Sequence, residues 1–516
     1  MPQKILKKIS ENILPAWKVC FVSAVVVGLL AHLYKITNWL PNWDSLVFRY
    51  DSQNMIALGR WFLPVVCSFS SFYDLPFLNG IVSIVLHALS AVCICKILNV
   101  YRKITAFLIG AIIVSFPTVT SVMMYNYVAD GYSFAFLLST IAALLMTQAK
   151  PRYILAAVIS ALSMGIYQAY ITVTIMLVLL KLIDETIYYN KGFSVILKKS
   201  ILMLSSGVAA VVIYAVVLKV LLAISSVELL EYQGINNAAS LSSIDLLGSI
   251  YVIKETFIKC FFDLSAGINA YVILNSIVAL LTVVHYIKYI IENKIYKKPV
   301  NVFMLLVLSV MLVVGAGALA FVNSGIDYHN LMLMGYSIFY MFFIILYERG
   351  ADKTSTLDGI KCWIIILTAA AIVSNQVVIA NVSYHKAQMA YEKSYGVLIR
   401  IADRIEQTPE AEDCDKILVI GALENSEEYS VNLTPNITGI TNGYIIRADD
   451  ETVNQSVLCS ALGDYCEKDY EFISGAEKEK FMQQEDVASM KNWPSKDCLK
   501  VIDDTIIIKL GTEGED

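Results

Sequence analysis

The sequence is poor in charge, since only 16% of its 516 residues are Asp, Glu, Lys or Arg. A typical soluble domain has about a quarter. There is no low-complexity segment and no obvious internal repeat, and carboxylates are missing from the middle of the apolar runs. Proton-coupled transporters tend to place carboxylates there, often in repeated halves. These absences argue against a soluble enzyme and against a proton-coupled transporter.

The sequence is instead rich in long apolar runs, and 57% of its residues are hydrophobic. A helix of about 20 residues crosses a hydrocarbon core of roughly 30 Å. We therefore predict a mainly α, polytopic membrane bundle of about eleven spans. They are Trp17–Thr37, Phe77–Leu98, Ile104–Met123, Tyr132–Ala149, Tyr153–Gln168, Tyr170–Asp184, Ser200–Ile224, Ile268–Ile291, Val300–Asn323, Asn330–Tyr347 and Gly359–Asn381.

The run from Tyr153 to Asp184 is too long for one straight span, and basic residues flank both of its ends. Two short helices that turn at Tyr167-Gln168-Ala169-Tyr170 would return the chain to the same side. One tilted helix is the alternative, and it would reverse the side of every later loop.

The distribution of basic residues predicts the orientation. Of the 26 Lys and Arg up to Asn381, 20 fall in or beside cytoplasmic segments when the N-terminus is inside, and 6 fall outside. This is a strong positive-inside bias. We expect a multi-pass protein of a bacterial inner (plasma) membrane, with a cytoplasmic N-terminus and an extracytoplasmic C-terminus.

The last 135 residues differ in composition, because they carry a net charge of −14 against +9 for the preceding part. We expect a transmembrane domain over residues 1–383 and a small α/β exterior domain over residues 384–516. In that domain, Tyr384–Gln407 and Thr452–Leu462 are predicted as helices, and Lys416–Ala422 and Thr505–Leu510 as buried strands.

Four of the ten cysteines lie in this tail: Cys414, Cys459, Cys466 and Cys498. An even number in an exterior domain favours two disulfides, in one of three pairings. A metal site is the alternative, but no CxxC pair supports it.

The outer loop from Asn38 to Pro76 is the densest polar stretch of the membrane part. Trp39, Trp43 and Trp61 are typical of a segment at headgroup depth. Leu46, Val47, Tyr50, Ile56 and Leu58 could form an amphipathic helix on the membrane. Asp44 and Asp51, seven residues apart, would share one face of it, with Arg49 and Arg60 nearby.

This layout suits sugar transfer from a polyprenyl phosphate, whose head lies at the surface while its tail stays in lipid. A carboxylate would take the proton of the acceptor hydroxyl, and an arginine would hold the phosphate bidentately. Asp44 and Arg60 are the candidates. On spacing alone, Asp44 could equally cap the loop helix, and Arg60 could contact lipid phosphates.

Other outer residues are weaker candidates for substrate binding. Asp130 could bind acceptor hydroxyls or cap the fourth span, and the cap is favoured. Tyr167 and Gln168 could bind the donor or satisfy the hairpin turn. Lys219 is one of few ionisable residues inside an apolar run. The loop from Ser225 to Gly267 is predicted to be an amphipathic lid without an assigned role.

Three segments carry a family resemblance: NWDSLVFRYDSQNMIALGRWFLP from Asn42, FPTVTSVMMYNYVADGYSFAF from Phe116, and MGIYQAY from Met164. Together with Ser374-Asn375-Gln376 they resemble the bacterial type II glucosyltransferases, which modify O-antigens. The resemblance implies a GT-C-like membrane enzyme. It would move glucose from undecaprenyl phosphate to a surface polysaccharide outside the inner membrane.

Within the resemblance, Asp44 matches the acidic position of the first loop, and Arg60 and Trp61 match its Gly-Arg-Trp element. Ser45 stands where many members have a second acid. The region that corresponds to the arginine entering a late span reads Asp327-Tyr328-His329-Asn330 here, and His329 or Lys219 could supply that phosphate contact instead.

The expected partners are the lipid-linked sugar donor, the polysaccharide acceptor and the bilayer, and no nucleic acid. No metal-ligand cluster is evident, so no cofactor is expected, although a divalent cation bridging the donor phosphate and Asp44 stays open. A flippase for lipid-linked sugars, a polysaccharide transporter and a non-catalytic envelope assembly protein are the alternative functions.

Overall fold

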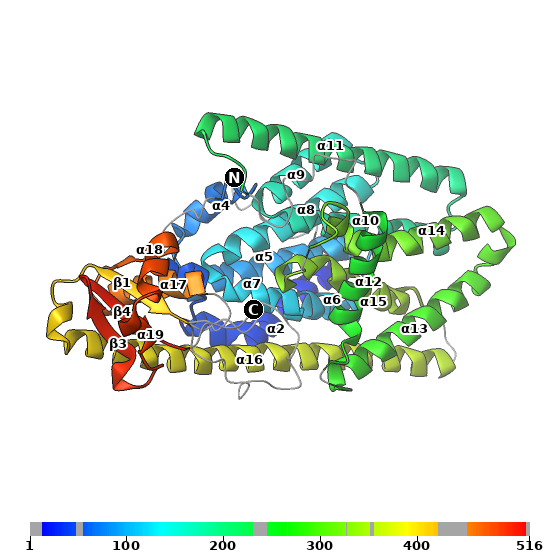
Figure 1. Cartoon of the computed structure of the whole chain (residues 1–516). Helices are drawn as coiled ribbons and strands as arrows, with labels where there is room; N and C mark the ends of the chain where they lie inside the picture. Colours follow the sequence, from blue (N-terminus) through cyan, green and yellow to red (C-terminus); the bar gives the residue numbers. More distant parts are fainter. Residues whose placement is uncertain are drawn as a thin grey trace, which may run out of the picture. The chain divides into compact units, whose positions relative to one another are not determined.

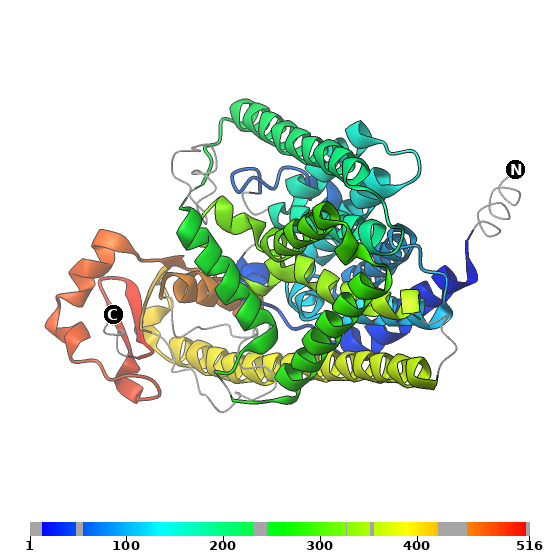
Figure 2. The same cartoon turned by 90° about the vertical axis from the view of Figure 1, so that its right-hand side faces the viewer.

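The computed structural model describes residues 13–47, 55–230, 245–265, 267–326, 328–350, 356–421 and 451–511. These residues form two compact units. The first contains the described parts of residues 13–38 and 55–381, and the second those of 39–47, 382–421 and 451–511. Figures 1 and 2 show that helices build the first unit and that the second contains the sheet.

The first unit is a bundle of helices (Figure 1). Its α-helices are α2 (Pro15–Thr37), α4 (Leu63–Cys67), α5 (Pro76–Ile97), α6 (Lys103–Ser115), α7 (Pro117–Met124), α8 (Ala129–Thr147), α9 (Tyr153–Ile166), α10 (Ile171–Ile187), α11 (Phe193–Ser225), α12 (Leu246–Phe262), α13 (Ala270–Glu292), α14 (Pro299–Ala316), α15 (Ile338–Gly350) and the first part of α16 (Thr356–Glu406). The 3₁₀ helix η8 (Asn330–Ser337) precedes α15.

Each predicted apolar run coincides with a helix or a pair of helices. In the described residues, eight helices are long and apolar enough to cross a membrane, or nine if α6 and α7 count as one bent span. The two remaining predicted spans are α9 and α10, which have only 14 and 17 residues. The number of crossings therefore stays a prediction, whereas the positions of the helices are confirmed.

The predicted span Ile104–Met123 is broken rather than straight. Its two halves, α6 and α7, meet at Pro117 with a bend of 42°. Proline lacks an N–H and forces the preceding residue out of the α region, and Phe116 accordingly has ψ 137°. Every residue of α7 is buried, so neighbouring helices surround this break.

The turn predicted between α9 and α10 is present as the 3₁₀ helix η3 (Gln168–Tyr170). At the start of α9, the Tyr153 carbonyl accepts from Ser206 of α11, whereas Gln168 after the end of α9 contacts Tyr214. At the end of α10, Glu185 pairs with Lys199 near the start of α11. Thus α9 runs along α11 in the same direction and α10 runs against it, as a hairpin requires.

Ionic contacts gather at the end of the bundle that we predict to be cytoplasmic. Arg349 donates to Asp184 through two nitrogens, each at 2.9 Å, and to the Leu98 carbonyl at 2.7 Å. Glu348 accepts from the backbone of Tyr101 and Arg102 and from the Thr105 hydroxyl. The ends of α5, α10 and α15 and the start of α6 are therefore tied together.

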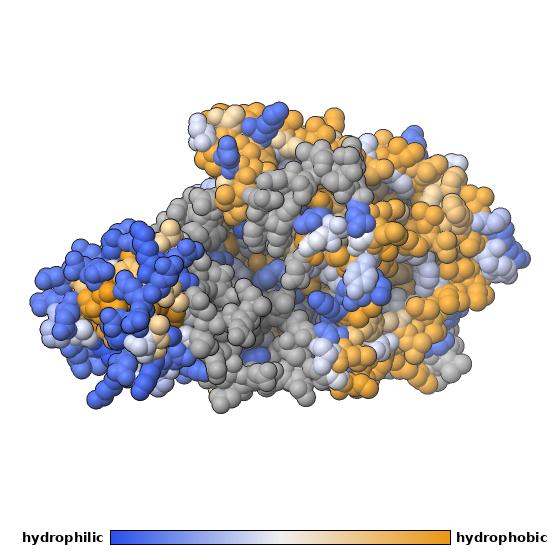
Figure 3. Space-filling model, viewed as in Figure 1, coloured by the Kyte–Doolittle hydropathy of each residue, from blue (hydrophilic) through white to orange (hydrophobic). Residues whose placement is uncertain are grey.

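The outer helices expose long apolar faces. In the apolar 18-residue stretch of α11, only 17% is buried inside the protein, and in that of α13 only 22%. The corresponding share for the stretch that contains α8 is 78%. Figure 3 shows the apolar side chains over the helices of the first unit, whereas the surface of the second unit is mostly polar. Apolar faces of this extent need lipid contact, because a soluble protein rarely exposes patches larger than a few hundred Å². The chain is a membrane protein.

The second unit contains a four-stranded mixed sheet in the order β2 (Glu471–Phe472), β1 (Lys416–Ile420), β4 (Thr505–Lys509), β3 (Leu499–Ile502). β1 pairs in parallel with β2 and β4, and β3 pairs antiparallel with β4. Successive β1 residues point to opposite faces, so Ile417 lies in one core and Leu418 in another. The strands β1 and β4 and the helix α17 (Glu451–Cys466) confirm the predicted positions, whereas β2, β3, α18 (Gly475–Met482) and α19 (Glu485–Ala488) are additional.

The short helix α3 (Trp43–Val47) belongs to this second unit. Leu46 is 2% exposed in its core, beside Ile401 and Leu458. The amphipathic helix predicted on the membrane surface is therefore wrong for Leu46, which packs against protein. It is also wrong for Ile56 and Leu58, which lie in turns.

The predicted disulfides are also wrong, because all four cysteines of this unit are free thiols. Cys459 and Cys466 lie on one helix two turns apart, about 10 Å along its axis, which exceeds the reach of a disulfide. Cys414 and Cys459 pack in the core with Leu46. Cys498 is buried, and its sulfur accepts from Arg404 at 3.1 Å.

Candidate functional site

The Gly59-Arg60-Trp61 segment forms a tight turn before α4. Gly59 has a φ of +74°, a conformation that suits glycine, and a Cβ there would lie 2.5 Å from the Tyr214 hydroxyl. The hydroxyl of Tyr214 donates to the Gly59 carbonyl at 3.0 Å, and Gln168 donates to the Leu58 carbonyl at 3.1 Å. Gln168 also donates to Tyr214 at 2.9 Å. Residues from η3 and α11 thus fix the backbone of this turn.

The Arg60 guanidinium lies 5.1 Å above the ring centre of Tyr167 and donates to the Tyr132 hydroxyl at 3.1 Å. The rings of Tyr132 and Tyr167 are stacked, with centres 4.8 Å apart and planes at 25°. Both tyrosines are buried, at 3% and 5% exposure, and Arg60 is half-buried. A guanidinium held over an aromatic ring and by a hydrogen bond is preorganised for the bidentate binding of phosphate.

Trp61 lies beside this arginine and packs against Gly165. A Cβ on Gly165 would lie 2.6 Å from the indole Cε2, so only glycine leaves room for the ring. The Phe62 amide donates to the Gly165 carbonyl at 2.7 Å, which fixes the two segments to each other. The indole Nε1 is buried and has no hydrogen-bond partner among the described residues. A buried donor of this kind gains free energy from an acceptor brought by a ligand.

Asp130 lies in the first turn of α8 and is buried, with 3% exposure. Its carboxylate accepts from the Gly131 amide at 2.9 Å and from the Cys67 thiol at 3.8 Å. Burial and then the Asp130 charge raise the pKa of the Cys67 thiol, which therefore stays a neutral donor. Asp130 is the second residue of α8, whose N-cap position is Val128 and has no side-chain cap hydrogen bond, so the cap predicted for Asp130 is wrong and acceptor binding stays a prediction.

Asp44 is half-buried in the first turn of α3. The capping role considered for it falls to Asn42, whose Oδ1 accepts from the Ser45 amide at 2.8 Å. The Ser45 hydroxyl in turn donates to the Asn42 carbonyl at 2.9 Å. Asn42 and Ser45 therefore explain the start of the helix without using the Asp44 carboxylate as the cap.

The remaining predicted site residues do not join the Arg60 cluster in the part of the chain that is described. Arg49 and Asp51 lie outside the described residues. Lys219 is exposed on α11, a helix that is mostly uncovered. His329 accepts from the Leu331 amide at 3.2 Å, and its ring meets Tyr125 with centres 5.7 Å apart. His329 thus serves as the N-cap of η8, and a late phosphate contact from His329 or Lys219 stays a prediction.

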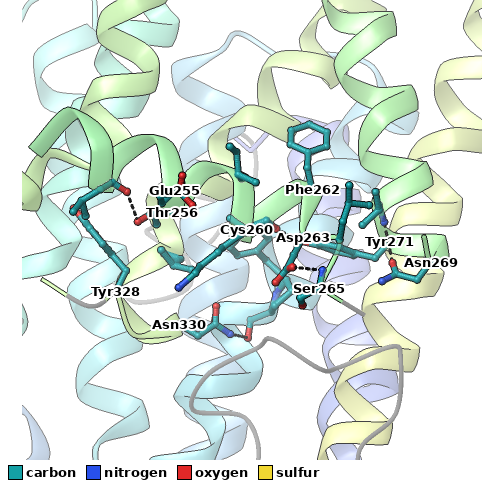
Figure 4. A pocket seen from close by; sticks show the side chains of 18 of the residues that line it. Glu255, Thr256, Cys260, Phe262, Asp263, Ser265, Asn269, Tyr271, Tyr328 and Asn330 are labelled. Atoms are coloured by element: carbon teal, nitrogen blue, oxygen red, sulfur yellow. Dashed lines mark hydrogen bonds between the residues drawn. The ribbon is translucent and has the colours of Figure 1, made fainter. Parts of the chain in front are cut away.

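A second feature of the first unit is a cavity of about 760 Å³ (Figure 4). One wall is α12, and the others come from the starts of α13 and η8 and from the break at Pro117. Its charged lining residues are Glu255, Lys259 and Asp263. Glu255 and Lys259 lie in the loop that the sequence predicted as a lid without a role, and the structure places both at a cavity.

Residue spacing gives no signal for Tyr132, Gly165 and Tyr214, which lie far from Arg60 along the chain. Tyr132 falls within the quoted segment from Phe116, and Gly165, Tyr167 and Gln168 fall within MGIYQAY. Tyr214 lies in none of the quoted segments. In the described residues, no group of three or more His, Cys, Asp or Glu side chains could hold a metal ion.

Comparison with known proteins shows a family match. Residues 33–346 match the family model described as Glucosyl transferase GtrII, which covers more than half of the chain. No curated protein and no solved structure matches the chain. The matched region contains the Gly59-Arg60-Trp61 turn, all lining residues of the cavity except Ile379, and all helices from α3 to the greater part of α15.

Proposed function

Because the chain belongs to the Glucosyl transferase GtrII family, we propose that it moves glucose from a polyprenyl-phosphate carrier to a cell-surface polysaccharide. Transfer would occur on the outer face of the bacterial inner membrane. The family makes the chain a glucosyltransferase, and the apolar helices make it a membrane protein. Beyond this, we propose the identity of the lipid carrier, the identity of the acceptor and the side of the membrane on which transfer occurs.

The observation that carries the proposal is the setting of Arg60. Glycosyl transfer from a lipid phosphate releases a phosphate anion, so the site needs a cation that stabilises this leaving group. Arg60 directly follows the turn at Gly59, lies over the ring of Tyr167 and donates a hydrogen bond to the Tyr132 hydroxyl. We assign it the role of phosphate ligand, with the buried Nε1–H of Trp61 as a second donor.

Asp44 is proposed as the general base that takes the proton of the acceptor hydroxyl. Support comes from the position of Asp44 in the region that matches the family model, and from the ability of a carboxylate to take such a proton. Asp44 belongs to the second unit and Arg60 to the first, so the base role and the phosphate-binding role are tested in separate variants. Asp51 and Arg49 of the same loop stay candidates for catalysis and for substrate binding, respectively. Both lie outside the described residues.

The test uses the full-length protein purified in detergent. It receives polyprenyl-phosphate glucose labelled in the sugar, together with surface polysaccharide from cells that lack the protein. Asp44→Asn should lower transfer about 10²- to 10⁴-fold, the usual loss for a general base. Arg60→Gln should raise the donor KM, and Arg60→Lys should restore only part of it, because lysine lacks the planar fork.

Asp403→Asn is the matched control, since Asp403 is an exposed carboxylate of the same unit as Asp44. It should behave as wild type. Full activity of Asp44→Asn would exclude the base role. Wild-type protein that moves labelled lipid across vesicles without forming a glycosidic bond would favour the flippase instead.

A further inference from the structure

One face of α12 forms a wall of the 760 Å³ cavity. Val252, Glu255, Thr256, Lys259 and Cys260 line it at the spacing of three and four residues that places side chains on one helix face. Asp263 continues this face one residue past the end of the helix. The volume falls within the range of about 300–1,000 Å³ that is typical of ligand sites.

Internal hydrogen bonds hold the opposite walls. The Tyr328 hydroxyl donates to the Gly317 carbonyl at 2.7 Å and accepts from the Ala320 amide at 2.9 Å. Asn330 donates to the Ser121 hydroxyl at 3.0 Å, and Tyr271 donates to the Cys260 carbonyl at 3.0 Å. Figure 4 shows the side chains of Tyr328, Asn330 and Tyr271 around the cavity. The walls are therefore built in advance, as a binding site requires.

The charged side chains that line the cavity form fewer interactions with described residues than the side chains of the opposite walls. Glu255 pairs at 3.1 Å with Lys254, which is exposed and does not line the cavity. Asp263 uses Oδ1 to accept from the Ser265 amide at 2.8 Å, and no described residue pairs with Oδ2. Lys259 is exposed and forms no ion pair with a described residue. Two carboxylates and one ammonium give the described lining a net negative charge.

This charge selects among the ligands that a glucosyltransferase needs. A phosphate would meet two carboxylates in a partly apolar cavity, and like charges disfavour its binding. Sugar hydroxyls instead donate strong hydrogen bonds to carboxylates. The cavity also contains the rings of Tyr251, Phe262 and Tyr271, whose negative faces attract the C–H groups of a pyranose ring.

We propose that this cavity binds the acceptor, a neutral carbohydrate chain, and that Glu255 and Asp263 hold its hydroxyl groups. The inference rests on the proposed function and adds the acceptor site to it. Arg60 would then hold the anionic donor phosphate, and the α12 cavity would hold the neutral glycan. Both lie in the first unit.

The test separates acceptor binding from donor binding in the transfer assay described above. Glu255→Gln and Asp263→Asn should each raise the acceptor KM about tenfold, the loss expected for a hydrogen bond to a charged group. The donor KM should stay within about twofold of wild type. Glu228→Gln is the matched control, because Glu228 is an exposed carboxylate that does not line the cavity.

Lys259→Gln distinguishes the opposite assignment. If the cavity held the donor phosphate, Lys259→Gln would raise the donor KM and Glu255→Gln would lower it. Either of those results, or an unchanged acceptor KM in both carboxylate variants, would overturn the proposal.

A second readout does not depend on turnover. Short neutral hexose oligosaccharides should slow amide hydrogen exchange in residues 246–262 of the purified wild-type protein, whereas glucose 1-phosphate should not. Protection without any glucosyl transfer would support the cavity and reject the proposed function. Transfer without protection, and with unchanged acceptor KM in the variants, would reject the cavity alone.

Discussion

The indole of Trp61 lies against Gly165, so closely that a methyl group on Gly165 would come within 2.6 Å of the ring. The two residues join the first outer loop to the end of α9, and the Phe62–Gly165 hydrogen bond follows directly after. Arg60 is the neighbour of Trp61, and Tyr167 beneath its guanidinium lies two residues after Gly165. Displacement of the indole would therefore move both partners of the Arg60 cluster.

Gly165→Ala should consequently lower glucosyl transfer about 10- to 100-fold, because small displacements of positioning groups cost rate on this scale. The amount of folded protein should change little. Gly207→Ala is the control, since nothing lies within 4 Å of a Cβ at Gly207. Initial rates of both variants, measured at equal protein in the detergent assay, check the prediction. Equal rates for Gly165→Ala and wild type would show that the indole position does not matter.

Much of the fold was predictable because lipid imposes a simple rule on helix length. The apolar runs predicted where the helices lie, and the length of Tyr153–Asp184 together with its basic flanks predicted the turn at Gln168. The bend at Pro117 has a local cause as well, although Ile104–Met123 is predicted as a single span.

The partners of the candidate site were not predictable in the same way. Tyr214 contacts Gly59 across 155 residues, and Tyr132 contacts Arg60 across 72. No local pattern encodes which helix face meets which loop. The same reason explains Leu46, an apolar residue in a short helix that suits either a membrane surface or the protein core where it lies.

The second unit makes a prediction about thiol chemistry. Burial raises the pKa of the Cys459 thiol to about 12, whereas Cys466 on the same helix is more exposed. The thiolate is the reactive form, so Cys466 should react with maleimide at neutral pH well before Cys459. The rate at Cys459 should rise about tenfold for each pH unit until the pH approaches its pKa.

The sign of the stability effect follows from the same shift. A raised pKa means that the folded state favours the neutral thiol, so this stabilisation is complete below the ordinary pKa of 9.0 and is lost as the pH rises towards about 12.

Mass spectrometry of maleimide-labelled peptides measures the order in which the cysteines react. After denaturation without reductant, all four cysteines of the unit should react, and a mobility shift on reduction would contradict the free thiols.

The hairpin of α9 and α10 makes a prediction about orientation. Lys150 precedes α9 and Gly192 follows α10, and both positions are exposed. If the two helices enter and leave on one side, cysteines at both positions should be shielded from an impermeant maleimide in intact cells. Glu228, which follows α11, should lie on the outer side. The variants are Lys150→Cys, Gly192→Cys and Glu228→Cys, in a background whose native cysteines are replaced.

The expected result is labelling of Glu228→Cys in intact cells and of the other two only after the membrane is opened. Gly192 suits the purpose because a Cβ there meets nothing within 4 Å. A single tilted helix would instead place Lys150 and Gly192 on opposite sides, so labelling of just one of them in intact cells would reject the hairpin. It would also move the loop containing Glu255 and Lys259 to the cytoplasmic side, where an acceptor at the cell surface could not reach the cavity.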